Sequence, residues 1–256
     1  PHLSDDSPPE GGFHSVYGAT EGFPLCYVSS SILSETQEQT ASGMGVCLGN
    51  EVGEIDLRIF SYIESEDIHD IPPVEKQVTI SKLPIGEISV NGPVVYSSLI
   101  GQDEGLFGGP ISWAIGKKDG TRWHRTGDLG YRDQEGRIWI VGRKSHSVKL
   151  HNGLFLHTKP VEEFFNSRLG IRTAIVQGLD NQKPILIVEK SETEWPEMNT
   201  LMADEAKNFS ELFGERLNLQ FILYDDSFPV DSGHEAKIER EKLNVWAIKK
   251  LKNNRS

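Results

Sequence analysis

The stretch Trp123-His124-Arg125-Thr126-Gly127-Asp128-Leu129-Gly130 comes shortly before an Asp-Gln-Glu-Gly turn at 133–136. The apolar run 137–142 follows the turn, so the pattern predicts two strands joined as a hairpin. We expect Asp128 at the mouth of this two-stranded ribbon. Its carboxylate accepts hydrogen bonds and donates none, which suits it to bind a vicinal diol such as a ribose. Arg143, one strand further on, adds charge for the same ligand. The alternative is an ordinary turn Asp and a surface Arg.

The composition excludes several classes of protein. A chain of 256 residues holds one large domain or two smaller ones. The formal net charge is −12 and the Lys and Arg residues form no basic run, so a nucleic-acid partner is not expected. Cys26 and Cys47 give neither a disulfide scaffold nor a zinc spacing. No long apolar segment or signal-peptide pattern is present, so we expect a cytoplasmic protein with no integral membrane segment.

The first candidate site lies near the start of the chain. Residues 1–12 are polar and are predicted to form a loop, and structure then begins abruptly at Phe13, as in the middle of something larger. The next motif is Tyr17-Gly18-Ala19-Thr20-Glu21. It predicts a short strand that places a hydroxyl and a carboxylate at a strand end, where open α/β sheets bind ligands. The Thr20 hydroxyl suits a phosphate oxygen and the Glu21 carboxylate suits Mg²⁺; the alternative is an ordinary turn.

The middle of the chain is predicted to be β-structure. Residues 53–60 and 86–92 alternate polar and apolar, which indicates half-buried scaffold strands without a catalytic role. Residues 64–75 are acidic and 101–120 are Gly-rich, so we expect a solvated connection and a long loop.

After Arg143 the sequence predicts a small α+β domain. We place the boundary between residues 1–142 and 143–256. The predicted elements of this second domain are a helix beginning at Lys159, strands at 173–179 and 184–190 joined by a turn at 180–182, a helix at 199–218, a strand at 219–224 and a helix at 239–251. His146 and His151 lack a third ligand nearby, so a metal site there is not expected.

Lys237 lies between the last predicted strand and the last predicted helix, in a segment rich in Pro and Gly. Such a segment is usually only a loop. The alternative is that Lys237 moves onto a substrate carboxylate and phosphate when the small domain closes over the large one.

Together these motifs resemble the adenylate-forming superfamily, which contains acyl-CoA synthetases, fatty acyl-AMP ligases and luciferases. The resemblance rests on the order of motifs along nearly the whole chain: Tyr-Gly-Ala-Thr-Glu at 17–21, Gly-Glu-Ile at 86–88, Arg-Thr-Gly-Asp-Leu at 125–129, Gly-Arg-Lys at 142–144 and Ala-Lys-Ile-Glu-Arg at 236–240. It implies a mixed α/β and α+β fold: the C-terminal part of the large domain, as a sheet end plus distorted β-barrel, and then a small mobile α+β lid.

Within the superfamily the chain resembles the β-lactone synthetases of long-chain olefin biosynthesis, in the 123–131 and 142–146 motifs and in the tail 228–247. That resemblance implies adenylation of a 3-hydroxy fatty acid by ATP with Mg²⁺, closure of its hydroxyl on the acyl carbon, and other enzymes of olefin biosynthesis as partners.

The resemblance also implies a role for each motif residue. Tyr17 would stack on adenine beside Gly18, Thr20 would hold the α-phosphate and Glu21 the Mg²⁺. Asp128 would bind the ribose hydroxyls with help from Arg143. Lys237 would neutralise charge in the adenylation transition state.

The sequence departs from the superfamily in three places. Ser145 stands where acyl-CoA synthetases have an Asp or Lys hinge, and 153–157 lacks their Gly-aromatic-Arg-Ile-Glu run. Both departures favour intramolecular closure over thioester formation. No Ser/Thr/Gly-rich phosphate loop precedes Tyr17. We therefore expect little adenylation from this chain alone. The alternatives are an acyl-CoA or acyl-AMP ligase of the same fold and a non-catalytic binding module.

Overall fold

The computed structural model describes residues 13–19, 21–61, 83–95, 113–115, 122–178, 183–214, 217–231 and 234–253. The predictions for residues 1–12, 64–75 and 180–182, for most of 101–120, and for Thr20 lie outside these residues. The described chain divides into two compact units, one with residues 13–38, 46–61 and 83–144 and the other with residues 39–45 and 145–253. The prediction of a mixed α/β fold is confirmed, and each unit is described by itself.

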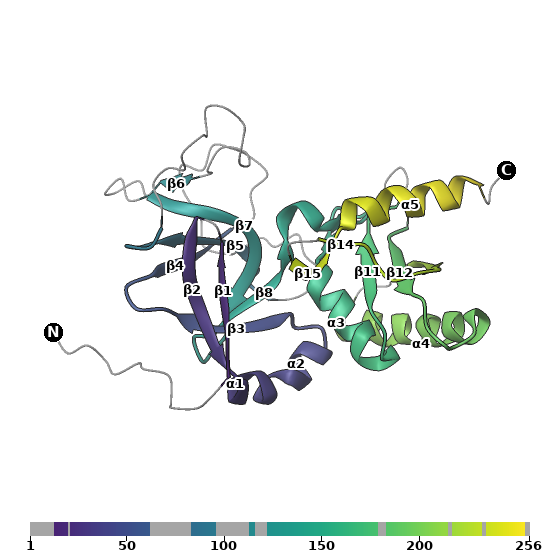
Figure 1. The fold of residues 1–256 in the computed structure, drawn as a ribbon, viewed down its shortest axis with the longest axis horizontal. Coiled ribbons are helices and arrows are strands. Elements are labelled where there is room, and N and C mark those ends of the chain that lie inside the picture. The colour runs from purple at the N-terminus through teal and green to yellow at the C-terminus, as the bar shows by residue number, and fades with distance from the viewer. Residues whose placement is uncertain are drawn as a thin grey trace. The chain divides into compact units, whose positions relative to one another are not determined.

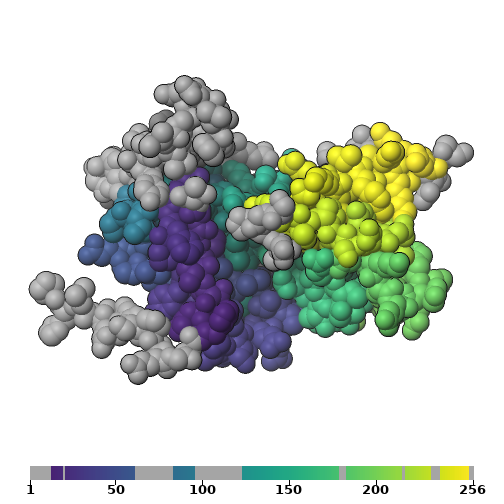
Figure 2. Space-filling view, in the orientation of Figure 1, coloured from purple at the N-terminus to yellow at the C-terminus, as the bar shows by residue number. Residues whose placement is uncertain are grey.

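The first unit is built on one antiparallel sheet (Figure 1). Its strands are β1 (His14–Ala19), β2 (Gly22–Ser29), β3 (Val46–Glu51), β4 (Asp56–Ser61), β5 (Gly86–Asn91), β6 (Trp113–Ile115), β7 (Arg122–Arg132) and β8 (Ile138–Arg143). The order is β1-β2-β3-β8-β7-β5-β4, with β6 added to β7. The short helices α1 (Ser30–Glu35) and α2 (Gln37–Ala41) follow β2. In Figure 2, β1 and β2 lie at the surface, and Val16 and Phe23 on them are exposed.

The predicted hairpin around Asp128 is formed by β7 and β8. In their register Asp128 lies opposite Arg143, at the open end of the hairpin, and Arg132 lies opposite Ile138 beside the turn. Asp133 closes that turn, because its carboxylate accepts hydrogen bonds from the Arg137 side chain at 2.7 Å and from the Trp139 indole at 2.8 Å.

β5 differs from the half-buried strand that the sequence predicts. Its first five residues are all buried. The reason is its place in the sheet, since it pairs with β4 on one side and β7 on the other. Its apolar Ile88 and Val90 enter a core with Leu25, Leu57 and Ile138, while Glu87 and Ser89 are covered on the other face.

A 3-10 turn at Lys144–His146 leads from the first unit into the main part of the second, which continues with the short pair β9 (Val148–Lys149) and β10 (Phe155–Leu156). Its main sheet has the order β11-β12-β13, with β11 (Thr173–Val176), β12 (Ile185–Glu189) and β13 (Gln220–Tyr224). Among the described strands only β12 and β13 pair in parallel, and α4 (Trp195–Phe213) makes the crossover between them. The remaining elements are α3 (Thr158–Leu169), β14 (Val230–Asp231), β15 (His234–Ile238) and α5 (Arg240–Asn253).

Both faces of this three-stranded sheet are covered by helices. Because side chains alternate along each strand, neighbouring residues enter opposite faces. Ile175, Leu186 and Val188 pack on one face with residues of α3 and α4. Their neighbours Ala174, Ile185 and Ile187 pack on the other face with Leu243, Ala247 and Leu251 of α5.

The long helix lies earlier in the chain than the sequence predicts. The sequence predicts a helix at 199–218, whereas α4 runs from Trp195 to Phe213 and ends at Gly214 in the left-handed conformation (φ +68°). A glycine accepts that conformation without strain, so it stops the helix. The apolar stripe is real, and it starts one turn earlier, at Met198.

His157 precedes α3 and is buried. Its Nδ1 lies 3.1 Å from the hydroxyl oxygen of Ser147, and burial lowers its pKa to about 4. The folded protein therefore disfavours the protonated imidazole. The buried, neutral His157 makes its full contribution to the free energy of unfolding above pH 6.5. That contribution is lost as the pH falls from 6.5 toward 4.

We expect His157→Gln to remove this pH dependence. The interval from 6.5 to about 4 corresponds to roughly 3 kcal/mol, at about 1.4 kcal/mol per pH unit. The measurement is hydrogen exchange of α3 amides between pH 4.5 and 7.5, corrected for the intrinsic exchange rate. His151→Gln is the matched control, because His151 is exposed. An equal pH dependence in the native protein and the His157 variant would contradict the assignment.

No helix among the described residues is long and apolar enough to cross a membrane.

Candidate functional site

Three residues predicted to bind one ligand meet in the first unit. The Tyr17 hydroxyl of β1 donates to Asp128 Oδ2 at 2.6 Å, and Arg143 Nε of β8 lies 2.9 Å from Asp128 Oδ1. The Asp128 side chain is 8% exposed and that of Arg143 is 45% exposed, so the guanidinium faces solvent while the carboxylate lies below it. The pKa of Tyr17 is raised well above its usual value, first by burial and second by the charge on Asp128. The phenol therefore stays protonated and keeps donating.

The backbone around Asp128 is held by Thr126. The Thr126 hydroxyl donates to the Ile88 carbonyl at 2.9 Å and accepts the Asp128 N–H at 3.1 Å. Arg143 Nη1 donates to the Thr126 carbonyl at 2.9 Å. Gly127 has φ +74°, a conformation that costs little only for glycine. The sequence pattern alone indicates no role for Thr126, and its only local signal is a hydroxyl residue two positions before the candidate Asp.

A buried carboxylate braces both sides of this cluster. Glu87 on β5 is 5% exposed, and Arg125 of β7 binds it with two nitrogens, one of them Nε at 3.0 Å. Lys144 Nζ lies 3.6 Å from the same oxygen of Glu87. Arg125 is three residues before Asp128 and Lys144 directly follows Arg143, so Glu87 ties the two supporting strands together. The sequence assigned Glu87 only to scaffold, because alternation alone put it on a solvated face.

Glu21 lies in the turn between β1 and β2, and Thr20 lies outside the described residues. The motif was expected at the end of a strand of an open α/β sheet; instead β1 is an edge strand in an antiparallel sheet. Glu21 Oε2 is 3.9 Å from Nε2 of His124, which is buried. Burial lowers the pKa of His124, while the charges of Glu21 and Glu87 oppose that change.

Glu21 offers one carboxylate for the Mg²⁺ that the sequence predicts. No group of three or more His, Cys, Asp or Glu within the described ranges is placed to hold a metal ion. Mg²⁺ is commonly held by one or two carboxylates together with substrate phosphates and water, so one carboxylate fits that ion.

Gly18 lies in β1, close against the start of β2. A Cβ at Gly18 would lie 2.5 Å from the Phe23 ring and 3.0 Å from the Gly22 carbonyl oxygen. The register of the two strands shifts between Tyr17 and Ala19. A glycine at position 18 therefore lets the chain bulge directly after Tyr17.

Lys237 belongs to the second unit. It lies in β15 of the β14–β15 hairpin, whereas the sequence predicted a loop. Its side chain is exposed.

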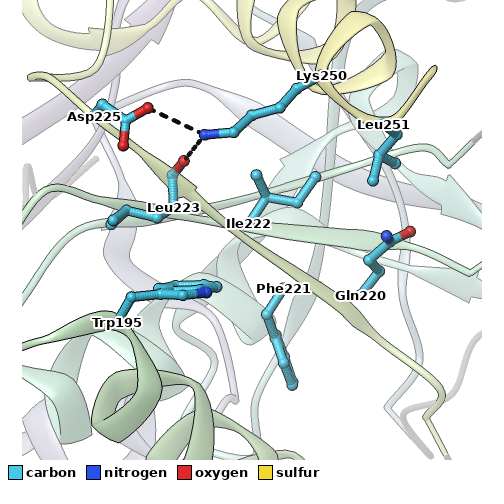
Figure 3. A pocket seen from close by; sticks show the side chains of 8 residues that line it. All are labelled: Trp195, Gln220, Phe221, Ile222, Leu223, Asp225, Lys250 and Leu251. Atoms are coloured by element: carbon cyan, nitrogen blue, oxygen red, sulfur yellow. Dashed lines mark hydrogen bonds and ion pairs between the residues drawn. The ribbon is translucent and has the colours of Figure 1, made fainter. Parts of the chain in front are cut away.

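A pocket of about 360 Å³ in the second unit contains none of the predicted site residues (Figure 3). It lies beside β13, with Trp195 on one side and Lys250 on the other. Lys250 Nζ donates to the Leu223 carbonyl at 2.9 Å and to Asp225 at 3.1 Å. Its charge is already paired, so we assign the pocket no role.

Two curated proteins similar to this chain are both olefin β-lactone synthetases. The chain is 34% identical over 251 residues to an olefin β-lactone synthetase of Stenotrophomonas maltophilia, covering 95% of this chain and 44% of the relative. It is 31% identical over 247 residues to an olefin β-lactone synthetase of Xanthomonas campestris, covering 94% and 43%. A long-chain-fatty-acid–CoA ligase of Schizosaccharomyces pombe is 27% identical over 71% of this chain and 24% of its own length. The chain thus spans less than half the length of these relatives.

Solved structures share the fold. An amide bond synthetase from Marinactinospora thermotolerans matches with a TM-score of 0.62 and 18% identity, over 91% of this chain and 42% of that protein. An o-succinylbenzoate coenzyme A synthetase from Bacillus subtilis, solved with ATP and magnesium, matches with a TM-score of 0.58 and 19% identity, over 91% and 41%. A search of protein-family models gave no match.

Proposed function

We propose that this chain belongs to the adenylate-forming superfamily and is part of an enzyme that activates a 3-hydroxy fatty acid with ATP and closes it to a β-lactone. The observation that carries the proposal is the meeting of Tyr17, Asp128 and Arg143, which come from three strands. An ordinary turn Asp would not need a buried phenol and an exposed guanidinium on its two oxygens.

In this proposal the cluster binds the nucleoside. Asp128 accepts the ribose hydroxyls, and Arg143, whose guanidinium is part exposed, adds a donor and a positive charge. Tyr17 offers its ring to the adenine, and the glycine at Gly18 lets the chain approach closely. Thr20 is assigned to the α-phosphate and Glu21 to Mg²⁺, which when bound neutralises charge on the phosphates.

The chemistry has two steps. A carboxylate oxygen of the fatty acid bonds to the α-phosphorus of ATP, and the bond to the bridging oxygen breaks, so pyrophosphate leaves. The 3-hydroxyl oxygen then bonds to the acyl carbon and loses its proton. The bond between that carbon and the phosphate oxygen breaks, so AMP leaves. Negative charge spreads over the phosphate oxygens in the first step. Lys237 supplies a positive charge there.

The proposal also covers the location, the substrate and the partners of the protein. We place the protein in the cytoplasm, with a small acyl substrate and with other enzymes of olefin biosynthesis as partners. The names of the two curated relatives support the acyl substrate and the link to olefin biosynthesis. The similarity to a fatty-acid–CoA ligase keeps an acyl-CoA or acyl-AMP ligase as the second candidate.

The test is ATP–pyrophosphate exchange with 3-hydroxy fatty acids, followed by product analysis, on the protein that carries this chain. We expect exchange that depends on the fatty acid and Mg²⁺, and a lactone with AMP as products without coenzyme A. Acyl-CoA formed only when coenzyme A is added would support the second candidate. ATP binding without exchange would indicate a non-catalytic binding module and would contradict the proposal.

A further inference from the structure

The hairpin that carries Lys237 is tied to the second unit at its C-terminal end by a buried ion pair. Arg240 begins α5, three residues after Lys237. Its Nη2 donates to Glu162 Oε2 at 2.6 Å, and its Nη1 binds the other oxygen, Oε1, of the same carboxylate. Glu162 is 3% exposed and the Arg240 side chain is 13% exposed. Two parallel bonds from a planar guanidinium fix direction as well as distance.

Glu162 connects this pair to the rest of the unit. It lies on α3, and its Oε1 also accepts the N–H of Ile175 on β11 at 3.0 Å. One carboxylate therefore links a helix, a core strand and the residue that follows the hairpin. Removing either charge would leave the other buried without its partner, which is costly.

The N-terminal end of the hairpin is held in a similar way. Glu189 on β12 accepts the N–H of Phe228 at 2.6 Å and binds the guanidinium of Arg172. Burial raises the pKa of Glu189, but the bonds from Arg172 and Phe228 outweigh it, so the net shift is downward. Between the two ends, the Glu239 N–H donates to the Pro229 carbonyl at 2.9 Å and closes the hairpin on itself.

We propose that the Glu162–Arg240 pair is a positioning pair for Lys237: it fixes the direction in which β15 presents that lysine during adenylation. The inference rests on the proposed function. The lysine is exposed and extends from a two-stranded hairpin, so its own contacts do not determine its place. Its position is set by the backbone, and the ion pair holds that backbone only three residues away.

The kinetic test uses Glu162→Gln, which keeps an acceptor for Ile175 but removes the charge. On the protein that carries this chain we expect kcat for adenylate formation to fall by about 10- to 100-fold, as for a misplaced reacting group. KM for ATP should stay unchanged, and lactone formation from a preformed 3-hydroxyacyl adenylate should proceed at the native rate. Arg240→Lys keeps the positive charge but loses the two parallel bonds of the guanidinium, and it should give the same pattern. It replaces the Glu162 variant in this test if that variant fails to fold.

A double variant separates positioning from general structural damage. If the pair acts through Lys237, then Glu162→Gln should cause no further loss in a Lys237→Ala background. Losses that multiply, or equal losses from ATP and from the preformed adenylate, would overturn the positioning role. If Lys237→Ala alone leaves adenylation unchanged, the role of Lys237 in the proposed function fails, and the positioning proposal fails with it.

Hydrogen exchange on this chain gives a readout that needs no activity. Amides of β14 and β15 should exchange faster in Glu162→Gln, while those of β12 should not. Lys242→Met is the matched control: it removes the exposed pair with Glu239 in the first turns of the same helix and should change neither exchange nor kinetics. Unchanged exchange in the hairpin of the Glu162 variant would also overturn the proposal.

Discussion

Replacing Lys237 with alanine is expected to lower kcat for adenylate formation by about 10²–10³, comparable to losing one donor that stabilises transition-state charge. ATP affinity should hardly change, because the residues proposed to hold the ground state belong to the other unit. Supplying a preformed 3-hydroxyacyl adenylate should restore ring closure, since that step involves no attack on phosphorus. Rapid-quench measurement of AMP and lactone from both starting points checks the prediction.

The control for this variant is Lys249→Ala. Lys249 is an exposed lysine of α5 in the same unit, so the substitution removes the same charge from the same unit. It should leave both half-reactions unchanged. A Lys237 variant that is equally slow from the preformed adenylate would show that Lys237 is not specific to the first step. A variant as fast as the native protein with ATP would make Lys237 a surface lysine.

Asp128→Ala should weaken nucleotide binding by about 1.5–3 kcal/mol, the range for hydrogen bonds to a charged group. This corresponds to roughly 10- to 150-fold in Kd. The substitution also leaves Tyr17 and Arg143 without their common acceptor, so some loss of stability is expected as well. Isothermal titration with ATP, at a temperature where thermal denaturation shows the variant folded, measures the affinity alone.

Asp133→Ala is the matched control for this experiment. Asp133 is a hydrogen-bonded carboxylate at the other end of the same hairpin, held by Arg137 and Trp139. Both variants should lose stability, but only the Asp128 variant should lose affinity. Equal affinities in the two variants would remove Asp128 from the ribose site. Equal losses would mean that the hairpin as a whole, and not this carboxylate, supports binding.

Local pattern was enough to predict the hairpin around Asp128. A four-residue turn between two strand-like runs fixes the pairs beside it, Arg132 with Ile138 and Tyr131 with Trp139. The register then shifts between Leu129 and Gly130, and this irregularity, which local pattern does not predict, places Asp128 opposite Arg143. The same reasoning found the order of the three helices and of the three-stranded sheet in the second unit, but not β9, β10, β14 or β15. It placed the start of α4 four residues too late, because the helix already begins at Trp195 with a proline in its first turn. It placed the end too late as well, because Gly214 ends the helix before Leu217, an apolar residue that is buried without being helical.

The sequence by itself determined which residue types stand close together along the chain: an Asp between strands, an Arg after the next strand, a Tyr-Gly before a Glu, and a Lys before the last helix. Only the tertiary structure decided which of them meet. Tyr17 reaches Asp128 across 111 residues, and Glu87 is buried against Arg125 because β5 lies beside β7. Strand order is set by contacts between distant segments, whose free energy depends on burial of the whole sheet. No local spacing records that order, so a residue assigned to plain scaffold proved to brace the candidate site.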